Sequence, residues 1–187
     1  MKKVISLILS LGVVMTSCAF LFESVYAETS EVLEFSCGLD ATAYLDRKTG
    51  MLTVKGKGEM NFFYDDIPWW AYRNEIYSVT VEEGITKIAE TAFLDCDITR
   101  ITLPASLEKI GDDALSMTDI EEIIIPDNSK LCEFYVTSYL RKTPWYKSQP
   151  DGPVYLGNML LEYKGEMSAN TEITVKNGTY AINCYAF

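Results

Sequence analysis

Residues 76–97 read IYSVTVEEGITKIAETAFLDCD, and residues 98–119 read ITRITLPASLEKIGDDALSMTD. Written as two rows, these stretches repeat their apolar positions at a fixed step of 22 residues, and a third row, IEEIIIP, begins at Ile120. The recurring sets include Ile76, Ile98 and Ile120; Val79, Ile101 and Ile123; and Val81, Leu103 and Ile125. A fixed apolar template with variable polar positions between is typical of a solenoid, in which equivalent units stack.

Each row predicts a short strand, then a turn, then one or two tight helical turns. Val79 and Val81 alternate with polar residues, which indicates a strand with one buried face. Gly84 breaks the alternation, and the spacing from Ile88 to Phe93 suits helical turns with an apolar edge. One row alone buries too little apolar area to offset the entropy lost on folding, so we expect the rows to stack on one another.

The first row also carries a family pattern. Residues 76–96 fit I-x-x-V-x-V-x-x-G-I-x-x-I-x-x-x-A-F-x-x-C, which resembles the BspA-type leucine-rich repeat. Row two departs from it at Leu115, which replaces the Phe, and it lacks the Cys. The resemblance implies an α/β repeat fold, a leucine-rich-repeat solenoid of short parallel strands. It also implies a bacterial protein that is secreted or exposed on the cell surface.

The N-terminal segment, residues 1–27, is predicted to be a signal peptide. Lys2 and Lys3 precede an apolar run, and Val25-Tyr26-Ala27 provides small residues for cleavage. A membrane anchor and lipidation at Cys18 are the alternatives. No later stretch approaches the length needed to span a bilayer, so we expect a secreted, extracellular or surface location without a membrane span after cleavage.

Residues 28–36 are interpreted as a polar linker, and residues 37–75 as an N-terminal β/aromatic cap. Within the cap, Ala43–Leu45 and Met51–Val54 predict a β-hairpin. The aromatic segment that follows lies just before the first repeat, where an open solenoid end needs covering. The alternative is a sugar-stacking platform formed by Trp69, Trp70 and Tyr72.

Residues 76–187 are assigned to the repeats, with an insertion at about 144–170. Residues 131–140 are expected to supply the helical edge of row three. Turn residues around Asp151-Gly152 precede two apolar runs separated by Gly157-Asn158, which predicts an inserted hairpin. The template resumes from Glu172 to Phe187, where the chain stops inside a row. We therefore expect a fragment truncated at its C-terminus, or else a frayed last row.

Composition excludes several functions. The chain has no histidine, which excludes Ser/His/Asp and Cys/His nucleophiles, and it has no phosphate-binding glycine loop. Its net charge of −11 argues against nucleic-acid binding. We predict no catalytic residues, no cofactor and no metal site. The cysteines of the mature chain are interpreted mostly as free, buried thiols, with disulfides as the alternative: Cys37, Cys96, Cys132 and Cys184.

The polar positions of the repeated strands remain as the candidate binding site, on the face that is concave in leucine-rich repeats. These are Ser78, Thr80, Glu82, Arg100, Thr102, Glu122 and Ile124, with Glu172, Thr174 and Lys176 in the last row. We predict a noncatalytic repeat module for protein recognition or adhesion, with an extracellular protein partner of host or bacterial origin. The alternative function is a carbohydrate- or cell-wall-binding accessory module with a polysaccharide ligand.

Overall fold

The computed structural model describes residues 32–63, 66–134 and 138–187. The chain divides into two compact units, Met1–Val32 and Leu33–Phe187, and Val32 is the one described residue of the first. The predicted signal peptide, Cys18 and the first part of the predicted linker therefore lie outside the described residues. Among the described residues, no helix is long and apolar enough to span a bilayer.

The described chain begins with three strands, β1 (Val32–Ser36), β2 (Asp40–Asp46) and β3 (Met51–Glu59); β1 pairs with β2, and β2 pairs with β3 in antiparallel orientation. The predicted hairpin lies inside β2 and β3, which pair from Asp40–Lys57 to Asp46–Met51. Residues 32–36 were expected to be linker but form β1. The reason is that Leu33 and Phe35 alternate with exposed residues and pack against the core, a two-residue apolar signal too short to identify as a strand from sequence.

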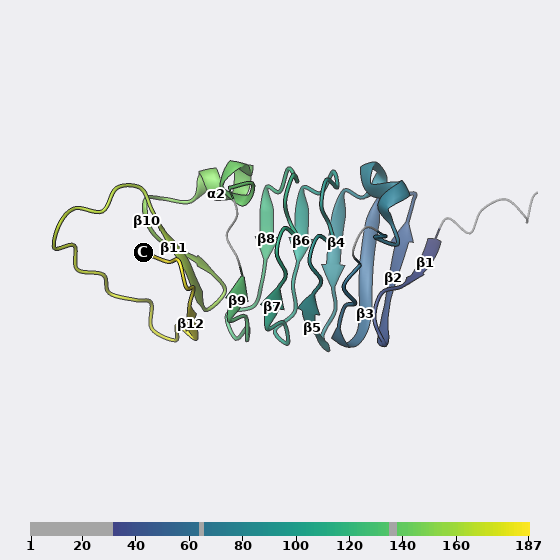
Figure 1. Ribbon diagram of the computed structural model, residues 1–187, viewed down its shortest axis with the longest axis horizontal. Helices are drawn as coiled ribbons and strands as arrows, with labels where there is room; N and C mark the ends of the chain where they lie inside the picture. The colour runs from purple at the N-terminus through teal and green to yellow at the C-terminus, as the bar shows by residue number, and fades with distance from the viewer. Residues whose placement is uncertain (1–31, 64–65, 135–137) are drawn as a thin grey trace, which may run out of the picture. The chain divides into compact units, whose positions relative to one another are not determined.

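Each repeat contributes two strands rather than one, so the solenoid has two adjoining columns of parallel strands (Figure 1). The first column stacks β4 (Ser78–Val81), β6 (Arg100–Thr102) and β8 (Glu122–Ile124) on β3. The second stacks β5 (Ile85–Ile88), β7 (Lys109–Ile110) and β9 (Glu133–Phe134) on the end of β3. We call these columns the first sheet, which also includes β2, and the second sheet. The step of 22 is confirmed, because Val79 pairs with Ile101, and Ile101 with Ile123.

The second strand was missed because its apolar spacing was interpreted as helical. Gly84 sharply bends the chain with φ of 106°, and a Cβ at this position would lie 2.5 Å from the carbonyl oxygen of Gly56 in β3. After the bend Ile85 and Ile88 are both buried, a spacing that fits a helix as well as a short, kinked strand. The expected helical edge at residues 131–140 is likewise replaced at Glu133–Phe134 by β9.

Left-handed residues form the turns after the second strand, where helical turns were expected. Thr91 and Asp113 have φ of 57° and 54°, and Asp95 and Met117 have φ of 55° and 59°. Each pair is separated by the repeat step, and the turns are joined by backbone hydrogen bonds such as the one from Phe93 N to Ala114 O, 3.0 Å. The repeat therefore fixes backbone conformation as well as the apolar template.

Trp69 closes the N-terminal end of the repeat core. Its indole is fully buried, stacks on Phe93 at 5.9 Å between ring centroids and meets Phe63 edge-on at 5.5 Å. The short 3-10 helix η1 (Trp70–Glu75) follows and leads into β4. The capping role expected for this segment stays a prediction, which the burial of Trp69 against Phe93 supports.

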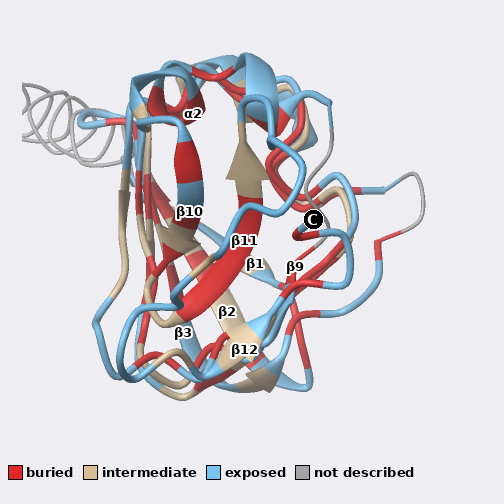
Figure 2. Ribbon diagram, turned by 90° about the vertical axis from the view of Figure 1, so that its left-hand side faces the viewer, coloured by how far each residue is buried: buried red, intermediate tan, exposed pale blue. Residues whose placement is uncertain are grey.

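The short 3-10 helix η2 (Leu140–Lys142) lies just before the predicted insertion, which contains the helix α2 (Pro144–Ser148) and a hairpin of β10 (Gly152–Leu156) and β11 (Met159–Lys164). Thr143 caps α2 by accepting a hydrogen bond from Tyr146 N at 3.2 Å. The inserted hairpin has its two-residue turn at Gly157-Asn158, as expected, and β11 is largely buried (Figure 2). Trp145 N donates to Ile120 O at 2.9 Å, which joins α2 to row three.

The last row is only partly formed. Its second strand, β12 (Ala181–Ile182), pairs in parallel with β11, whereas residues 172–176 form no strand. Phe187 is 67% exposed, whereas its template counterpart Phe93 is 0% exposed, and Ile182 and Val175 are also exposed. The template is therefore present in the sequence of this row but not buried as in the rows before it.

Candidate functional site

The outward face of the first sheet brings together most of the predicted binding residues. Ser78, Arg100 and Glu122 are neighbours in one line across β4, β6 and β8, and Thr80, Thr102 and Ile124 form a second line. Adjacent strands in a sheet are about 4.8 Å apart, so each line is a regular array. Glu82 follows the end of β4 and pairs with Lys55 Nζ at 3.2 Å.

Sequence reasoning missed the contribution of the N-terminal hairpin to this face. The strand register continues the first line to Met51 and Asp46, and the second line to Thr53 and Tyr44. The alternation of apolar and polar residues in β2 and β3 was visible in the sequence. This alternation does not by itself place the hairpin on the binding face, because the pairing of β3 with β4 depends on tertiary structure.

The three hydroxyls of the second line are available to a ligand. Thr53, Thr80 and Thr102 are half-buried neighbours, and within the described part of the chain their hydroxyls have no hydrogen-bond partner. In the first line, by contrast, Arg100 Nε pairs with Glu122 Oε2 at 3.2 Å. The face thus combines neutral donor–acceptor groups with charges that are already paired.

The last-row residues of the predicted site do not join this face. Residues 172–176, which include Glu172 and Thr174, form no strand with β8, and all but Ile173 are exposed. Lys176 instead pairs with Asp127 at 3.3 Å between Nζ and Oδ1, and its backbone N–H donates to the Tyr155 hydroxyl at 2.8 Å. The inserted hairpin thus takes part in holding this segment.

The three rings of the alternative site do not form one exposed platform. Trp69 is buried in the core, while Trp70 is 40% exposed and Tyr72 is half-buried. The guanidinium carbon of Arg73 lies 4.5 Å from the centroid of the Trp70 ring, and that of Arg47 lies 5.3 Å from the Tyr72 ring. Trp70 and Tyr72 therefore keep ring surface at the solvent, each with an arginine stacked on it.

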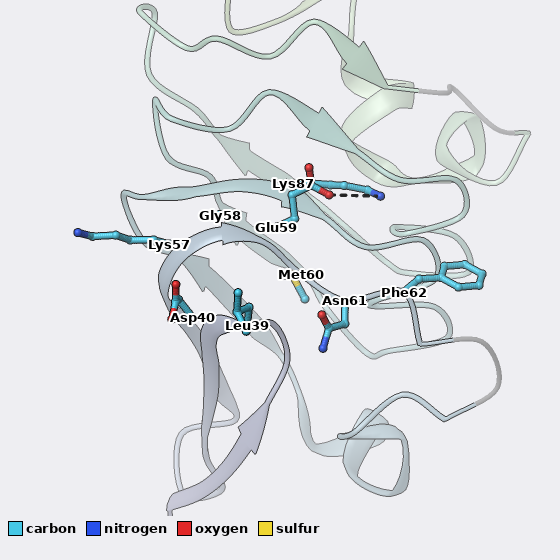
Figure 3. A pocket seen from close by; sticks show the side chains of 9 residues that line it. All are labelled: Leu39, Asp40, Lys57, Gly58, Glu59, Met60, Asn61, Phe62 and Lys87. Atoms are coloured by element: carbon cyan, nitrogen blue, oxygen red, sulfur yellow. Dashed lines mark ion pairs between the residues drawn. The ribbon is translucent and has the colours of Figure 1, made fainter.

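A hollow of about 450 Å³ lies where β3 passes from the first sheet to the second (Figure 3). Asp40, Asn61 and Leu39 line one part of it, and Glu59 and Lys87 line another, joined by an ion pair of 4.0 Å. Its volume falls within the roughly 300–1,000 Å³ of small-molecule sites. Its lining is mixed, with both charges, an amide and apolar side chains.

The chemistry of the described residues gives no catalytic constellation. They contain no group of three side chains suited to hold a metal ion. Burial raises the pKa of the Cys37 thiol to about 11 and that of Cys96 to about 12, so both thiols stay protonated at neutral pH and are poor nucleophiles. All four described cysteines are free, but Cys132 and Cys184 are exposed, so the expected burial holds for only two.

The stacked parallel strands with a repeated apolar template define this protein as a leucine-rich-repeat solenoid. Residues 69–142 match the BspA type leucine rich repeat region in six copies, so this part of the chain is similar to that family. Repeats of this family and fold are generally noncatalytic and generally bind proteins.

A solved leucine-rich repeat protein from Eubacterium ventriosum ATCC 27560 is similar to this chain, with 27% sequence identity and a TM-score of 0.51. The similarity covers 55% of this chain and 28% of that one, so this chain spans little more than a quarter of that protein's length. No curated protein matches the chain.

Proposed function

We propose that this protein is a noncatalytic, secreted or surface-exposed module that recognises an extracellular protein through the outward face of the first sheet. The observation that carries the proposal is the in-register array across β3, β4, β6 and β8, with three threonine hydroxyls in one line that have no hydrogen-bond partner among the described residues. Hydroxyls that both donate and accept suit the backbone and polar side chains of a protein partner. BspA-type repeats are typically secreted or surface proteins of bacteria, which supports the location.

The second sheet offers less free hydrogen-bonding capacity. Its outward line runs from Glu59 through Lys87 and Lys109 to Glu133, and the charges pair along the line. A partner that binds there would have to compete with ion pairs already made. The first sheet is therefore the better candidate for recognition.

A pull-down from host extracellular matrix and from bacterial surface extracts tests this function. Arg100→Glu combined with Thr102→Glu places acidic groups at the centre of the array and is expected to abolish retention of a specific partner. Both side chains lie on the solvent side of the sheet. The Arg100–Glu122 pair is exposed, so its loss lowers the free energy of unfolding by roughly 1 kcal/mol or less. Unaltered retention would refute the role of this face.

The matched control changes the net charge by the same amount at two other residues. Lys57→Glu combined with Asn61→Glu alters two residues that line the hollow beside β3. This control is expected to retain the partner. If it loses the partner while the first-sheet variant keeps it, the hollow and not the array is the recognition site.

The carbohydrate- or cell-wall-binding alternative is favoured by one observation, the exposed ring of Trp70. Affinity electrophoresis in polysaccharide gels tests it. A retarded band that returns to normal mobility in Trp70→Ala would support this alternative. A mobility unaffected by every polysaccharide leaves protein recognition as the function.

A further inference from the structure

A second surface feature lies at the edge of the first sheet, where the β2–β3 turn meets η1 and the start of β4. We call it the aromatic–arginine corner, and in Figure 1 it lies at the upper ends of β2, β3 and β4. It consists of Arg47, Met51, Trp70, Tyr72, Arg73 and Tyr77.

Arg73 is fixed on the Trp70 ring by three contacts. Its guanidinium carbon lies 4.5 Å from the ring centroid, and Nη1 donates to the Trp70 carbonyl at 3.3 Å. Its Nε donates to Asp95 Oδ2 at 3.2 Å, across one repeat step. The arginine and the ring are thus held in place before any partner arrives.

Arg47 makes a similar arrangement with Tyr72. Its guanidinium carbon lies 5.3 Å from the Tyr72 centroid, while Nε and Nη2 donate to the two carboxylate oxygens of Glu75 at 2.8 and 3.1 Å. A bidentate arginine–carboxylate pair is geometrically specific. This pair joins the β2–β3 turn to η1.

Tyr77 and Met51 complete the corner and connect it to the outward array. Tyr77 is 52% exposed and lies against Gly50, where a Cβ would be 2.3 Å from the Tyr77 ring. Met51 is 40% exposed and is the strand neighbour of Ser78, in the line that continues to Arg100. Met51 and Tyr77 therefore connect the β2–β3 turn to the array.

This composition is that of an interface hot spot. Tryptophan, tyrosine and arginine carry most of the binding energy in protein interfaces, and methionine is enriched there. Side chains that are already held by stacking and ion pairs lose less entropy when a partner binds. The corner thus supplies anchor residues that the small polar groups of the array lack.

A column of carboxylates beside the corner indicates the charge of the partner. Asp97 and Asp119 are separated by the repeat step of 22 and end rows one and two, whereas Glu75, one step before Asp97, is already paired with Arg47. The rows are in register here, since Asp97 N donates to Arg73 O at 3.2 Å and Glu121 N donates to Thr99 O at 2.8 Å. Asp97 and Asp119 are exposed, and the chain as a whole carries a net charge of −11. A basic partner complements this edge.

We infer that the corner anchors a basic segment of the protein partner. An apolar side chain of that segment packs among Met51, Trp70 and Tyr77, and its lysines or arginines lie along the carboxylate column. The inference deepens the proposed function and rests on it, because the corner supplies the anchor for the same recognition surface.

The inference is tested by selecting peptides from a random surface-displayed library with this chain as bait. The enriched peptides are expected to combine several Lys or Arg residues with an apolar side chain. Trp70→Ala is expected to weaken their binding about 30-fold, as for a hot-spot residue. Tyr180→Ala is the matched control, because Tyr180 is exposed in the last row, away from the corner, and should leave affinity unchanged.

Charge is tested separately. Asp97→Asn combined with Asp119→Asn should slow association severalfold at low salt, and the difference should shrink as salt screens the charges. Glu166→Gln combined with Glu172→Gln changes the net charge equally on the exposed C-terminal segment and should not slow association.

Three results would overturn the inference: no enriched peptide, enriched peptides that are not basic, or enriched peptides that bind Trp70→Ala normally. Retention of a pulled-down protein that depends on Arg100 and Thr102 but not on Trp70 would leave the proposed function standing without this anchor. Polysaccharide binding that depends on Trp70, with no peptide enriched, would assign the corner to a sugar instead.

Discussion

The indole nitrogen of Trp69 donates a 2.8 Å hydrogen bond to the carbonyl oxygen of Ala92, next to the ring of Phe93 on which Trp69 stacks. One side chain thereby covers the open apolar end of the first row and satisfies a backbone acceptor there. The hairpin, the aromatic segment and the repeats therefore share one apolar core.

Replacing Trp69 by Ala should destabilise the fold by about 3–5 kcal/mol, because it empties a fully buried site and leaves the Ala92 carbonyl without its partner. Urea unfolding followed by circular dichroism measures the change. The neighbouring Trp70→Ala should cost about 1 kcal/mol or less, since that ring is partly exposed and loses mainly its contact with Arg73. Equal losses for the two variants would contradict the capping role.

Replacing Glu162 by Gln should destabilise the insertion by about 1–3 kcal/mol, because the carboxylate is 5% exposed and accepts from Arg141 Nε at 3.1 Å and Nη2 at 2.6 Å. Hydrogen exchange of the β10–β11 hairpin reports the change locally. Glu122→Gln removes the partner of Arg100 from an exposed pair and serves as the comparison. The pair's role would be refuted if hairpin protection stayed the same.

Replacing Met117 by Asn should stabilise the protein by roughly 0.5–1 kcal/mol. Met117 has φ of 59°, a left-handed conformation that Asn tolerates better than Met, and its exposed side chain contributes little packing. Thermal unfolding of Met117→Asn and Met117→Ala separates backbone relief from the mere loss of the side chain. A gain in Ala as large as in Asn would exclude backbone strain as the cause.

The free energy of unfolding should fall as the pH rises above about 9, in part because of Cys96. Burial raises the pKa of its folded-state thiol from 9.0 to about 12, so between these values the unfolded chain loses a proton that the folded chain keeps. The fold then loses up to about 1.4 kcal/mol per pH unit from this group.

Urea unfolding at a series of alkaline pH values checks this prediction. The quantity to compare is the slope of the free energy of unfolding against pH, and not the free energy at one pH. Cys96→Ala should have a shallower slope than the parent chain over this window. Cys132→Ser, which removes an exposed thiol, is the comparison. An unchanged slope in Cys96→Ala would show that the buried thiol makes no contribution.

Local pattern was enough to predict the repeats, the N-terminal hairpin and the inserted hairpin. The step of 22 fixes which residues are equivalent, and an apolar template needs no knowledge of distant contacts to be recognised. The second strand of each row was missed because the spacing of Ile85 and Ile88 fits two conformations. In the observed strand conformation, the bend at Gly84 lies against the backbone of Gly56.

The candidate site was predictable only in part. The outward positions of β4, β6 and β8 follow from alternation, and the structure lines them up. Trp69, Trp70 and Tyr72 are close in sequence but separate into one buried ring and two rings stacked by arginines. Trp69 lies just before η1 and enters the core, whereas Trp70 and Tyr72 are on η1, which has no buried residue.

The sequence by itself determined the solenoid, its repeat and its lack of histidine chemistry, since these follow from composition and periodicity. Tertiary structure alone decided that β3 extends the array and that Arg47 reaches Glu75. It also decided that the last row leaves Phe187 exposed where Phe93 is buried. The physical reason is that periodicity specifies equivalent positions, whereas exposure depends on whether a neighbouring row packs against each of them.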